Sequence, residues 1–255
     1  MRAFAVLAGL VVLGAAAAEP SRPSPLKPGP DFQSADVRAL QADDFANPGM
    51  LWVAKGRDRF RAKGANGRRC ADCHGEEGEA LRGAATRFPK HDGALGRVTD
   101  LAGRIDACDR RHRGGAGLAR ESDALLELET FVANLSRGMA LAVSPEGSAR
   151  GAWEKGRDLY FTRIGQLNLA CTHCHDARWG RTLLAEPISQ GHPTGWPAYR
   201  LEWQAVGSLH RRLRACFFGV RAEQPAAGSD ELVALELYLA TRAKGLPVEA
   251  PGVRR

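Results

Sequence analysis

The sequence predicts a mainly α-helical protein in which one helical unit occurs twice in tandem. Two observations carry this prediction. The pentapeptide C-x-x-C-H occurs at Cys70–His74 and again at Cys171–His175, and each copy follows the same short motif, Lys55-Gly-Arg-Asp58 or Lys155-Gly-Arg-Asp158. The segments that close the two units also match, with an offset of 107 residues from Ser122 to Ser229. A repeat of this length is large enough to form a small domain of its own.

Residues 1–18 have the pattern of a cleavable secretory signal. Arg2 precedes an uncharged apolar run, and Ala16-Ala-Ala18 offers a small-residue cleavage site. The run is shorter than the roughly 20 apolar residues that a membrane span needs, although an uncleaved anchor is the alternative. We therefore expect a mature protein without a membrane span, which in a Gram-negative cell lies in the periplasm.

Residues 19–45 are rich in proline and polar residues, which predicts an extended arm with little structure of its own. Two domains are expected to follow, at residues 46–147 and 148–255. Their closing helices begin at the N-cap residues Ser122 and Ser229, carry apolar residues at helical spacing, and are expected to stop at Gly138 and Gly245.

The overall charge narrows the class of partner. The chain of 255 residues has a formal net charge of +7. A basic balance suits an anionic small molecule or an acidic protein. No basic tract is interleaved with aromatic residues, so we expect no nucleic-acid binding.

The repeated pentapeptide is typical of c-type haem attachment, in which two thiols bond to the haem and the adjacent histidine binds its iron. Two copies on an exported chain predict two covalently bound haem c groups. Two metal-binding or disulfide pairs with incidental histidines are the alternative. Each unit then reads as helix, haem loop, irregular stretch and closing helix, which is the order of a cytochrome c domain. The predicted fold is thus two tandem cytochrome c-like domains with an extended N-terminal arm, and the predicted attachment residues are Cys70, Cys73 and His74 in the first and Cys171, Cys174 and His175 in the second.

The second axial ligand of each iron is the next question. A methionine before the closing helix would be usual in an electron-transfer cytochrome, but no methionine lies in that stretch of either unit. The two remaining cysteines do, because Cys108 precedes Ser122 and Cys216 precedes Ser229 at nearly the same distance. We therefore expect thiolate ligation, with His74 and Cys108 on one iron and His175 and Cys216 on the other. A Cys108–Cys216 disulfide and axial ligation by a histidine are the alternatives, the candidate histidines being His91, His112, His192 and His210.

Charge distinguishes the two cysteines. Arg104 stands four residues before Cys108, and Arg212 four before Cys216. Asp106 and Asp109 flank Cys108, whereas the segment 208–221 around Cys216 contains arginines and no acid. Arginine binds oxyanions through paired hydrogen bonds and favours the thiolate form of a nearby cysteine. We therefore expect chemistry on a sulfur oxyanion at Cys216.

At this point the chain resembles the SoxA family, the di-haem subunits of the SoxAX cytochromes of bacterial sulfur oxidation. The resemblance covers nearly all of the mature chain. It rests on the two C-x-x-C-H motifs, on Arg104-Ile-Asp-Ala-Cys108, and on Leu209-His-Arg-Arg212-x-Arg-x-Cys216 followed by Val220-Arg-Ala-Glu223.

The resemblance implies a function and the roles of several residues. It implies His and Cys axial ligands at both haems, catalysis by Cys216 as a persulfide, and contact of Arg212 with substrate. It also implies an L-cysteine S-thiosulfotransferase, which joins thiosulfate oxidatively to a cysteine of the carrier SoxYZ and passes two electrons to haem. The implied partner is SoxX, a monohaem cytochrome, in a heterodimer.

Two other functions compete with this one. A di-haem electron-transfer cytochrome without bond-forming activity is the first alternative, and two thiolate ligands, which lower the potential, argue against it. A di-haem peroxidase is the second, and we find no pair of acid–base residues for its distal pocket.

Overall fold

The computed structural model describes residues 23–255, so the predicted signal at residues 1–18 lies outside the described residues. Its α-helices are α1 (Ala35–Ala42), α2 (Met50–Arg61), α3 (Ala71–His74), α4 (Leu101–His112), α5 (Asp123–Asn134), α6 (Arg150–Phe161), α7 (Cys171–His175), α8 (Leu209–Gly219) and α9 (Asp230–Arg242). Its strands are β1 (Lys90–Asp92), β2 (Arg97–Thr99), β3 (Thr182–Leu183), β4 (Glu186–Pro187), β5 (Ala198–Arg200), β6 (Ala205–Gly207) and β7 (Gly252–Arg254). The protein is mainly helical, as predicted.

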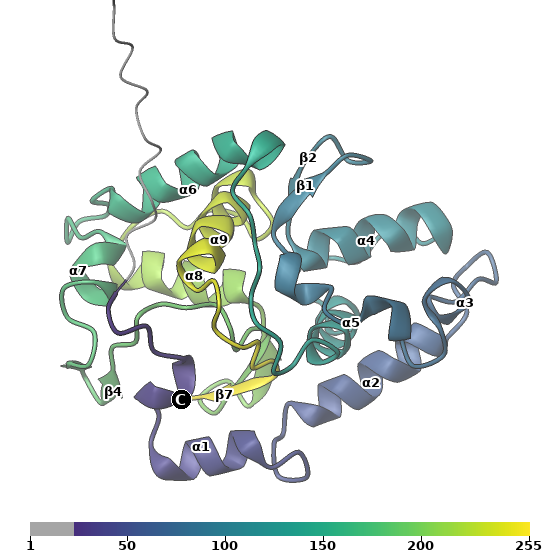
Figure 1. Ribbon diagram of the computed structural model, residues 1–255, viewed down its shortest axis with the longest axis horizontal. Coiled ribbons are helices and arrows are strands. Elements are labelled where there is room, and N and C mark those ends of the chain that lie inside the picture. Colours follow the sequence, from purple (N-terminus) through teal and green to yellow (C-terminus); the bar gives the residue numbers. More distant parts are fainter. Residues whose placement is uncertain (1–22) are drawn as a thin grey trace, which may run out of the picture.

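The helices form two groups that lie side by side in Figure 1, α2 to α5 on the right and α6 to α9 on the left. Within each group the first long helix packs against the closing helix, α2 against α5 and α6 against α9. The first core is built around Phe60, Leu128 and Phe131, and the second around Trp153 and Tyr238. Both groups thus bury one helix pair around one apolar core.

A glycine permits the close approach of the helices in each pair. Gly56 of α2 and Gly156 of α6 are the glycines of the repeated Lys-Gly-Arg-Asp motif. A Cβ atom at Gly56 would overlap the carbonyl oxygen of Glu127, and one at Gly156 would overlap that of Ala234. The Lys-Gly-Arg-Asp motif that reveals the repeat in the sequence therefore also supplies the glycine at which the two helices of each pair come closest.

The predicted N-caps of the closing helices are confirmed. The Ser122 hydroxyl accepts a hydrogen bond from the backbone N–H of Leu125, and the Ser229 hydroxyl accepts one from Leu232. The helices end at Asn134 and Arg242, before the expected stops at Gly138 and Gly245. Both glycines have positive φ, 82° and 93°, and both donate backbone hydrogen bonds to the neighbouring chain segment, from Gly138 to Val248 and from Gly245 to Leu141.

A short antiparallel hairpin precedes the fourth and the eighth helix, at equivalent places in the two groups. β1 pairs with β2, with Asp92 opposite Arg97, and β5 pairs with β6, with Arg200 opposite Ala205. β7 adds to β5 in parallel, which gives a three-stranded sheet in the order β6-β5-β7. Each hairpin leads directly into an N-capped helix, so it fixes where that helix starts.

The arm predicted at residues 19–45 is less irregular than expected. Residues 35–42 form α1, which contacts β7, and the Gln41 side chain accepts a hydrogen bond from the backbone N–H of Val253. The proline-rich part is extended and is held by Gln190, which accepts from the backbone of Lys27 and donates to that of Pro25. The prediction of little structure was wrong for α1, because its partner lies at the far end of the chain.

The C-terminal segment returns to the first group of helices. Leu246, Val248 and Ala250 are buried in the core that contains Leu128 and Phe131. The chain ends on β7, beside α1 (Figure 1). The last residues of the chain thus complete a core whose other members come from its first half. Over the described residues, no helix is both long and apolar enough to cross a bilayer.

Candidate functional site

The two C-x-x-C-H motifs form short helical turns. Cys70 is the N-cap of α3, which ends at His74, and α7 runs from Cys171 to His175. In a helical turn, residues at positions i, i+3 and i+4 share one face. Both thiols and the imidazole of each motif therefore face the same side, as bonding to a single macrocycle requires.

The ring of His175 is oriented by a backbone group. Its Nδ1 lies 2.8 Å from the carbonyl oxygen of Ser189. A carbonyl can only accept, so Nδ1 carries the proton and Nε2 keeps its lone pair. A ligating histidine needs that tautomer, held in this way by a hydrogen bond from the other ring nitrogen. The donor set of this loop therefore fits an iron-bound haem c.

The residue after His175 ties the loop to both long helices of its group. Asp176 accepts a hydrogen bond from the Tyr160 hydroxyl of α6 at 2.8 Å and pairs with Arg242 of α9 at 2.5 Å. In the first loop the residue after His74 is Gly75, which has a φ of 84° and no side chain to make such a bond. The second loop is therefore anchored more firmly than the first.

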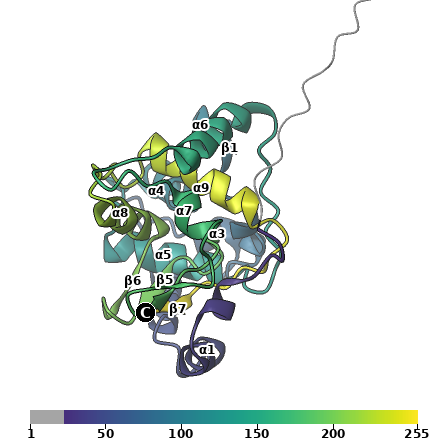
Figure 2. The ribbon, with the colours of Figure 1, turned by 90° about the vertical axis from the view of Figure 1, so that its left-hand side faces the viewer.

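Cys216 faces the second loop. It lies on α8, near enough to Cys171 and His175 for electrostatic interaction with both side chains. α7 and α8 both lie in the left-hand half of Figure 1 and on the side that faces the viewer in Figure 2. The structure thus brings together Cys171, His175 and Cys216, as the sequence predicts for one haem site.

Arg212 contacts the sulfur of Cys216 directly. Its guanidinium donates a hydrogen bond to Sγ at 3.1 Å, across one turn of α8. Burial acts to raise the pKa of Cys216, but the positive charges around it, that of Arg212 first, outweigh burial and hold the pKa below its ordinary value of 9.0. A guanidinium beside the sulfur favours the thiolate, which is the nucleophilic and iron-binding form.

Cys108 takes the corresponding place in the first group. It lies on α4 near Cys70 and Cys73, each of the three thiols being within electrostatic reach of another. Burial raises the pKa of Cys108 above its ordinary value, and the positive charge of Arg104 does not compensate. The two predicted ligand cysteines therefore differ in the direction of their pKa shift.

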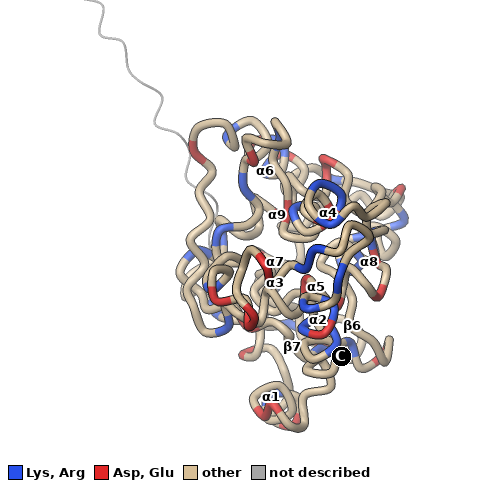
Figure 3. Tube along the Cα trace, turned by 90° about the vertical axis from the view of Figure 1, so that its right-hand side faces the viewer, with Lys and Arg blue, Asp and Glu red and all other residues tan. Residues whose placement is uncertain are grey.

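The charge of Arg104 is neutralised by Asp92, which was not among the residues predicted from the sequence. Its guanidinium donates to the carboxylate of Asp92, on β1, at 2.8 Å. The two acids expected to weaken its field bind elsewhere, because Asp106 pairs with Arg110 and Asp109 with Arg113. Figure 3 shows basic residues on α4 with acidic residues nearby. The expected contrast between the two cysteines is present, but its source is Asp92.

The alternative ligands that the sequence left open have other surroundings. All six cysteines are free, so Cys108 and Cys216 are not joined in a disulfide. The ring of His192 hydrogen-bonds to the Gln190 side chain at 3.0 Å. His91 lies on β1, in register with Val98. His112 ends α4 one turn after Cys108, so it lies on the same side of that helix.

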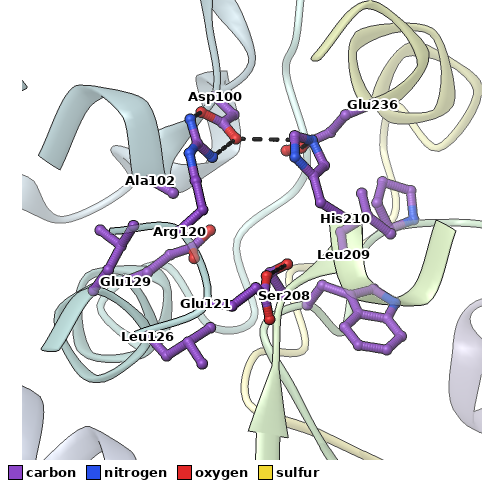
Figure 4. A pocket seen from close by; sticks show the side chains of 13 residues that line it. Asp100, Ala102, Arg120, Glu121, Leu126, Glu129, Ser208, Leu209, His210 and Glu236 are labelled. Atoms are coloured by element: carbon purple, nitrogen blue, oxygen red, sulfur yellow. Dashed lines mark hydrogen bonds and ion pairs between the residues drawn. The ribbon is translucent and has the colours of Figure 1, made fainter. Parts of the chain in front are cut away.

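His210 lies in a different cavity, between the two groups of helices. Its Nδ1 accepts a hydrogen bond from the backbone N–H of Gly228 at 2.9 Å, so Nε2 carries the proton. Nε2 faces Glu236 at 3.1 Å and Asp100 at 3.8 Å (Figure 4). A metal or iron bond at Nε2 needs a lone pair that this tautomer does not offer, so His210 is unsuited to be a ligand.

Three residues near the haem loops escaped the sequence analysis: Ser189, Asp92 and Arg200. Ser189 acts through its backbone carbonyl, which leaves no mark on the sequence. Asp92 and Arg200 both stand eight residues before the N-cap of the following helix, at Asp100 and Ser208. Aligning the repeats from those caps backwards would have paired these two residues.

The comparisons with known proteins agree with this geometry. The family model described as the SoxA/TsdA cytochrome c domain matches residues 55–141. The L-cysteine S-thiosulfotransferase subunit SoxA of Rhodovulum sulfidophilum is 38% identical over 230 residues, which cover 90% of this chain and 80% of the relative. That of Paracoccus pantotrophus is 37% identical over 224 residues, 88% of this chain and 77% of the relative. The crystal structure of SoxXA from P. pantotrophus matches with a TM-score of 0.86 and 36% identity, over 89% of this chain and 86% of that one.

Proposed function

Because this chain belongs to the SoxA family of L-cysteine S-thiosulfotransferase subunits, we propose that it joins thiosulfate to a cysteine of the carrier SoxYZ. One S–S bond forms between the carrier sulfur and the outer sulfur of thiosulfate. The carrier thiol loses its proton, and two electrons leave. The product is a cysteine S-thiosulfonate on the carrier.

The contact between Arg212 and Cys216 is the single observation that carries this proposal. A sulfur whose pKa is lowered, 3.1 Å from a guanidinium, offers a reactive thiolate and a binding group for an oxyanion in one place. Cys216 is the proposed catalytic residue, and Arg212 the proposed substrate-binding residue. Haem c, when bound beside them, supplies an acceptor for the two electrons.

The residues around Cys216 support an exchange of sulfur. Arg212 holds the thiosulfate dianion so that its outer sulfur lies near Sγ. Loss of two electrons then joins the sulfur of Cys216, as thiolate or persulfide, to the outer sulfur of thiosulfate. The carrier thiolate attacks that outer sulfur, which forms the carrier S–S bond and releases the sulfur of Cys216. Ser189 keeps the His175 ring oriented throughout, because its carbonyl holds the Nδ1 proton.

We propose two covalent haem c groups, one for each half of the chain. Cys70, Cys73 and His74 would hold the first, with Cys108 as its second axial ligand, and Cys171, Cys174, His175 and Cys216 would hold the other. The proposed organisation is two tandem cytochrome c-like domains at residues 46–147 and 148–255, after an arm at 19–45. The equivalent packing of α2 on α5 and of α6 on α9 supports it. The intact mass of the mature protein tests the haem count, since two haems survive acid–acetone extraction only if both are covalent.

The proposed partner is SoxX, a monohaem cytochrome that receives the electrons, in a periplasmic complex reached by a signal at residues 1–18. The match to SoxXA supports the complex with SoxX. Thiosulfate and SoxYZ as substrates follow from the proposed reaction.

The function is tested by mixing the purified complex with thiosulfate and SoxYZ. We expect the carrier to gain the mass of one thiosulfate group while haem is reduced. Reduction of haem with no change in the carrier's mass would instead favour a di-haem electron-transfer cytochrome without bond-forming activity.

A further inference from the structure

Asp92 and Arg200 occupy equivalent positions in the two halves of the protein. Each is the last residue of the first strand of a hairpin, β1–β2 or β5–β6. Each stands eight residues before the N-cap of the helix that carries the ligand cysteine. The two side chains therefore start from the same place relative to α4 and α8.

Asp92 and Arg200 carry opposite charges, so they change the surroundings of the two cysteines in opposite ways. Asp92 takes the guanidinium of Arg104 at 2.8 Å, which leaves that arginine neutralised beside Cys108. Arg200 cannot pair with Arg212, whose guanidinium instead donates to the sulfur of Cys216 at 3.1 Å. The first hairpin thus places a carboxylate, Asp92, beside the arginine of its site, so the charges there cancel. The second hairpin places another guanidinium, Arg200, in the equivalent position.

Arg200 is held in place by its own hairpin. Its side chain is 13% exposed, donates to Glu202 at 2.6 Å, and lies over the ring of Trp203 with its Cζ 5.1 Å from the centroid. Trp203 in turn contacts Arg211 of α8, whose Cζ lies 5.4 Å from the ring centroid. The hairpin is thereby packed against the first turns of α8, and Figure 2 shows β5 and β6 next to that helix.

The hydrogen-bonding capacity of Arg200 is only partly used. Its Nε is buried and has no hydrogen-bond partner among the described residues. Its carboxylate partner, Glu202, is 58% exposed, and both Arg200 and Arg212 lower the pKa of that group. An exposed carboxylate paired with Arg200 is a solvent-screened counter-ion that a bound dianion can replace.

We propose that Arg200 is a second substrate-binding residue, which together with Arg212 selects the doubly charged thiosulfate at Cys216. This inference rests on the proposed function of the Cys216 site. Two guanidinium groups present more donors than the three oxygens of thiosulfate need, and their combined charge matches the dianion. Asp92 removes the same capacity from the Cys108 site.

The test compares three variants at position 200 in the di-haem protein bound to its monohaem partner. Arg200→Ala should lower kcat/KM for thiosulfate by about ten- to a hundredfold, mainly through KM, since a hydrogen bond to a charged group is lost. Arg200→Lys should restore part of the loss. Arg200→Asp, which copies the first half, should lose more than Arg200→Ala because it also engages Arg212.

A singly charged analogue and a matched arginine sharpen this test. Methanethiosulfonate carries one negative charge, so Arg200→Ala should lose less activity with it than with thiosulfate. Arg150→Ala is the control, because Arg150 also lies over a tryptophan, Trp153, and pairs with a carboxylate, Glu154, but is on α6. Its KM for thiosulfate should stay within twofold of the wild-type value.

The outcomes separate this inference from the proposed function. Wild-type protein that fails to load the carrier would overturn the proposed function itself. Wild-type activity with an unchanged KM in Arg200→Ala and Arg200→Asp would overturn the inference alone. An altered haem spectrum or potential with an unchanged KM would also overturn it, since Arg200 would then serve the haem.

Discussion

Cys108 and Cys216 sit on equivalent turns of α4 and α8, each four residues after an arginine and shortly before a closing helix. At Cys216 that arginine donates to the sulfur, whereas at Cys108 it is bound by Asp92. The helices are alike, and the difference comes from the hairpin in front of each. The comparison teaches that one charge outside the C-x-x-C-H motif can distinguish two sites whose helices are alike.

Replacing the two cysteines by the same residue gives the largest expected contrast. Cys216→Met should abolish thiosulfate transfer to the carrier, because the reacting sulfur and its thiolate are lost. Cys108→Met should change the spectrum of the first haem and keep much of the turnover. Carrier loading and the intact mass, which should still include two haems, measure both. A dead Cys108→Met protein beside an active Cys216→Met protein would reverse the roles of the two sites.

The two arginines test the same contrast at a smaller scale. Arg212→Ala should reduce turnover about ten- to a hundredfold through loss of a charged hydrogen bond. Arg104→Ala should leave turnover nearly unchanged and instead lower the free energy of unfolding by about 1–3 kcal/mol, because the buried carboxylate of Asp92 loses its partner. Kinetic assays and denaturant titration of both variants separate these effects. Equal losses of turnover would contradict the assignment.

The two helix pairs, α2 with α5 and α6 with α9, should respond alike to the same substitution, unlike the two cysteine sites. Gly56→Ala and Gly156→Ala each force a Cβ against a carbonyl oxygen of the partner helix. Each should lower the free energy of unfolding by about 1–3 kcal/mol. Gly151→Ala on α6 is the control, since a Cβ there meets nothing within 4 Å. A loss at only one crossing would show that the two halves are not packed alike.

The cavity that contains His210, between the two groups of helices, gives the smallest expected effect. This effect is a dependence of the free energy of unfolding on pH. Burial raises the pKa of Glu129 well above its ordinary value of 4.5 and raises that of Glu236. His210 lies beside Glu236 with Nε2 protonated and with Nδ1 occupied by the backbone N–H of Gly228, so it takes up no further proton there. Arg120 and Asp100 also face this group, and Arg120 outweighs burial to hold the pKa of Asp100 below its ordinary value.

Glu129 and Glu236 bind protons more tightly in the folded state than in the unfolded state. Their contribution to stability is complete below their ordinary pKa values and is lost as pH rises through the raised ones. The free energy of unfolding should therefore fall as pH rises above 4.5, the ordinary pKa of glutamate. Asp100 acts in the opposite direction, and its contribution is lost only in acid.

Glu129→Gln should flatten that fall in stability, because the amide cannot ionise. The gain at alkaline pH should be on the order of 1 kcal/mol. Glu127→Gln is the control, because Glu127 lies on the same helix but is paired with Arg59. Denaturant titrations across the pH range measure both. A parallel pH profile in Glu129→Gln and wild-type protein would contradict this account.

Local signals in the sequence were enough to predict two equivalent C-x-x-C-H segments, the serine caps and the opening and closing helices of each unit. Each of these depends on a few adjacent residues, such as a C-x-x-C-H turn or a hydroxyl before a helix. Asp92 and Arg200 were missed, because strands of three residues carry no periodicity by which to place them. Helix α1 was missed because the contact that stabilises it, from Gln41 to Val253, joins residues far apart in the chain.

The return of the C-terminal segment has a consequence for the order of folding. Leu246, Val248 and Ala250 fill the core around Leu128 and Phe131. Domains usually fold from the N-terminus as the chain is made or exported. Here the N-terminal half cannot bury its core until the last residues have been delivered, so the half that begins first is the half that is finished last.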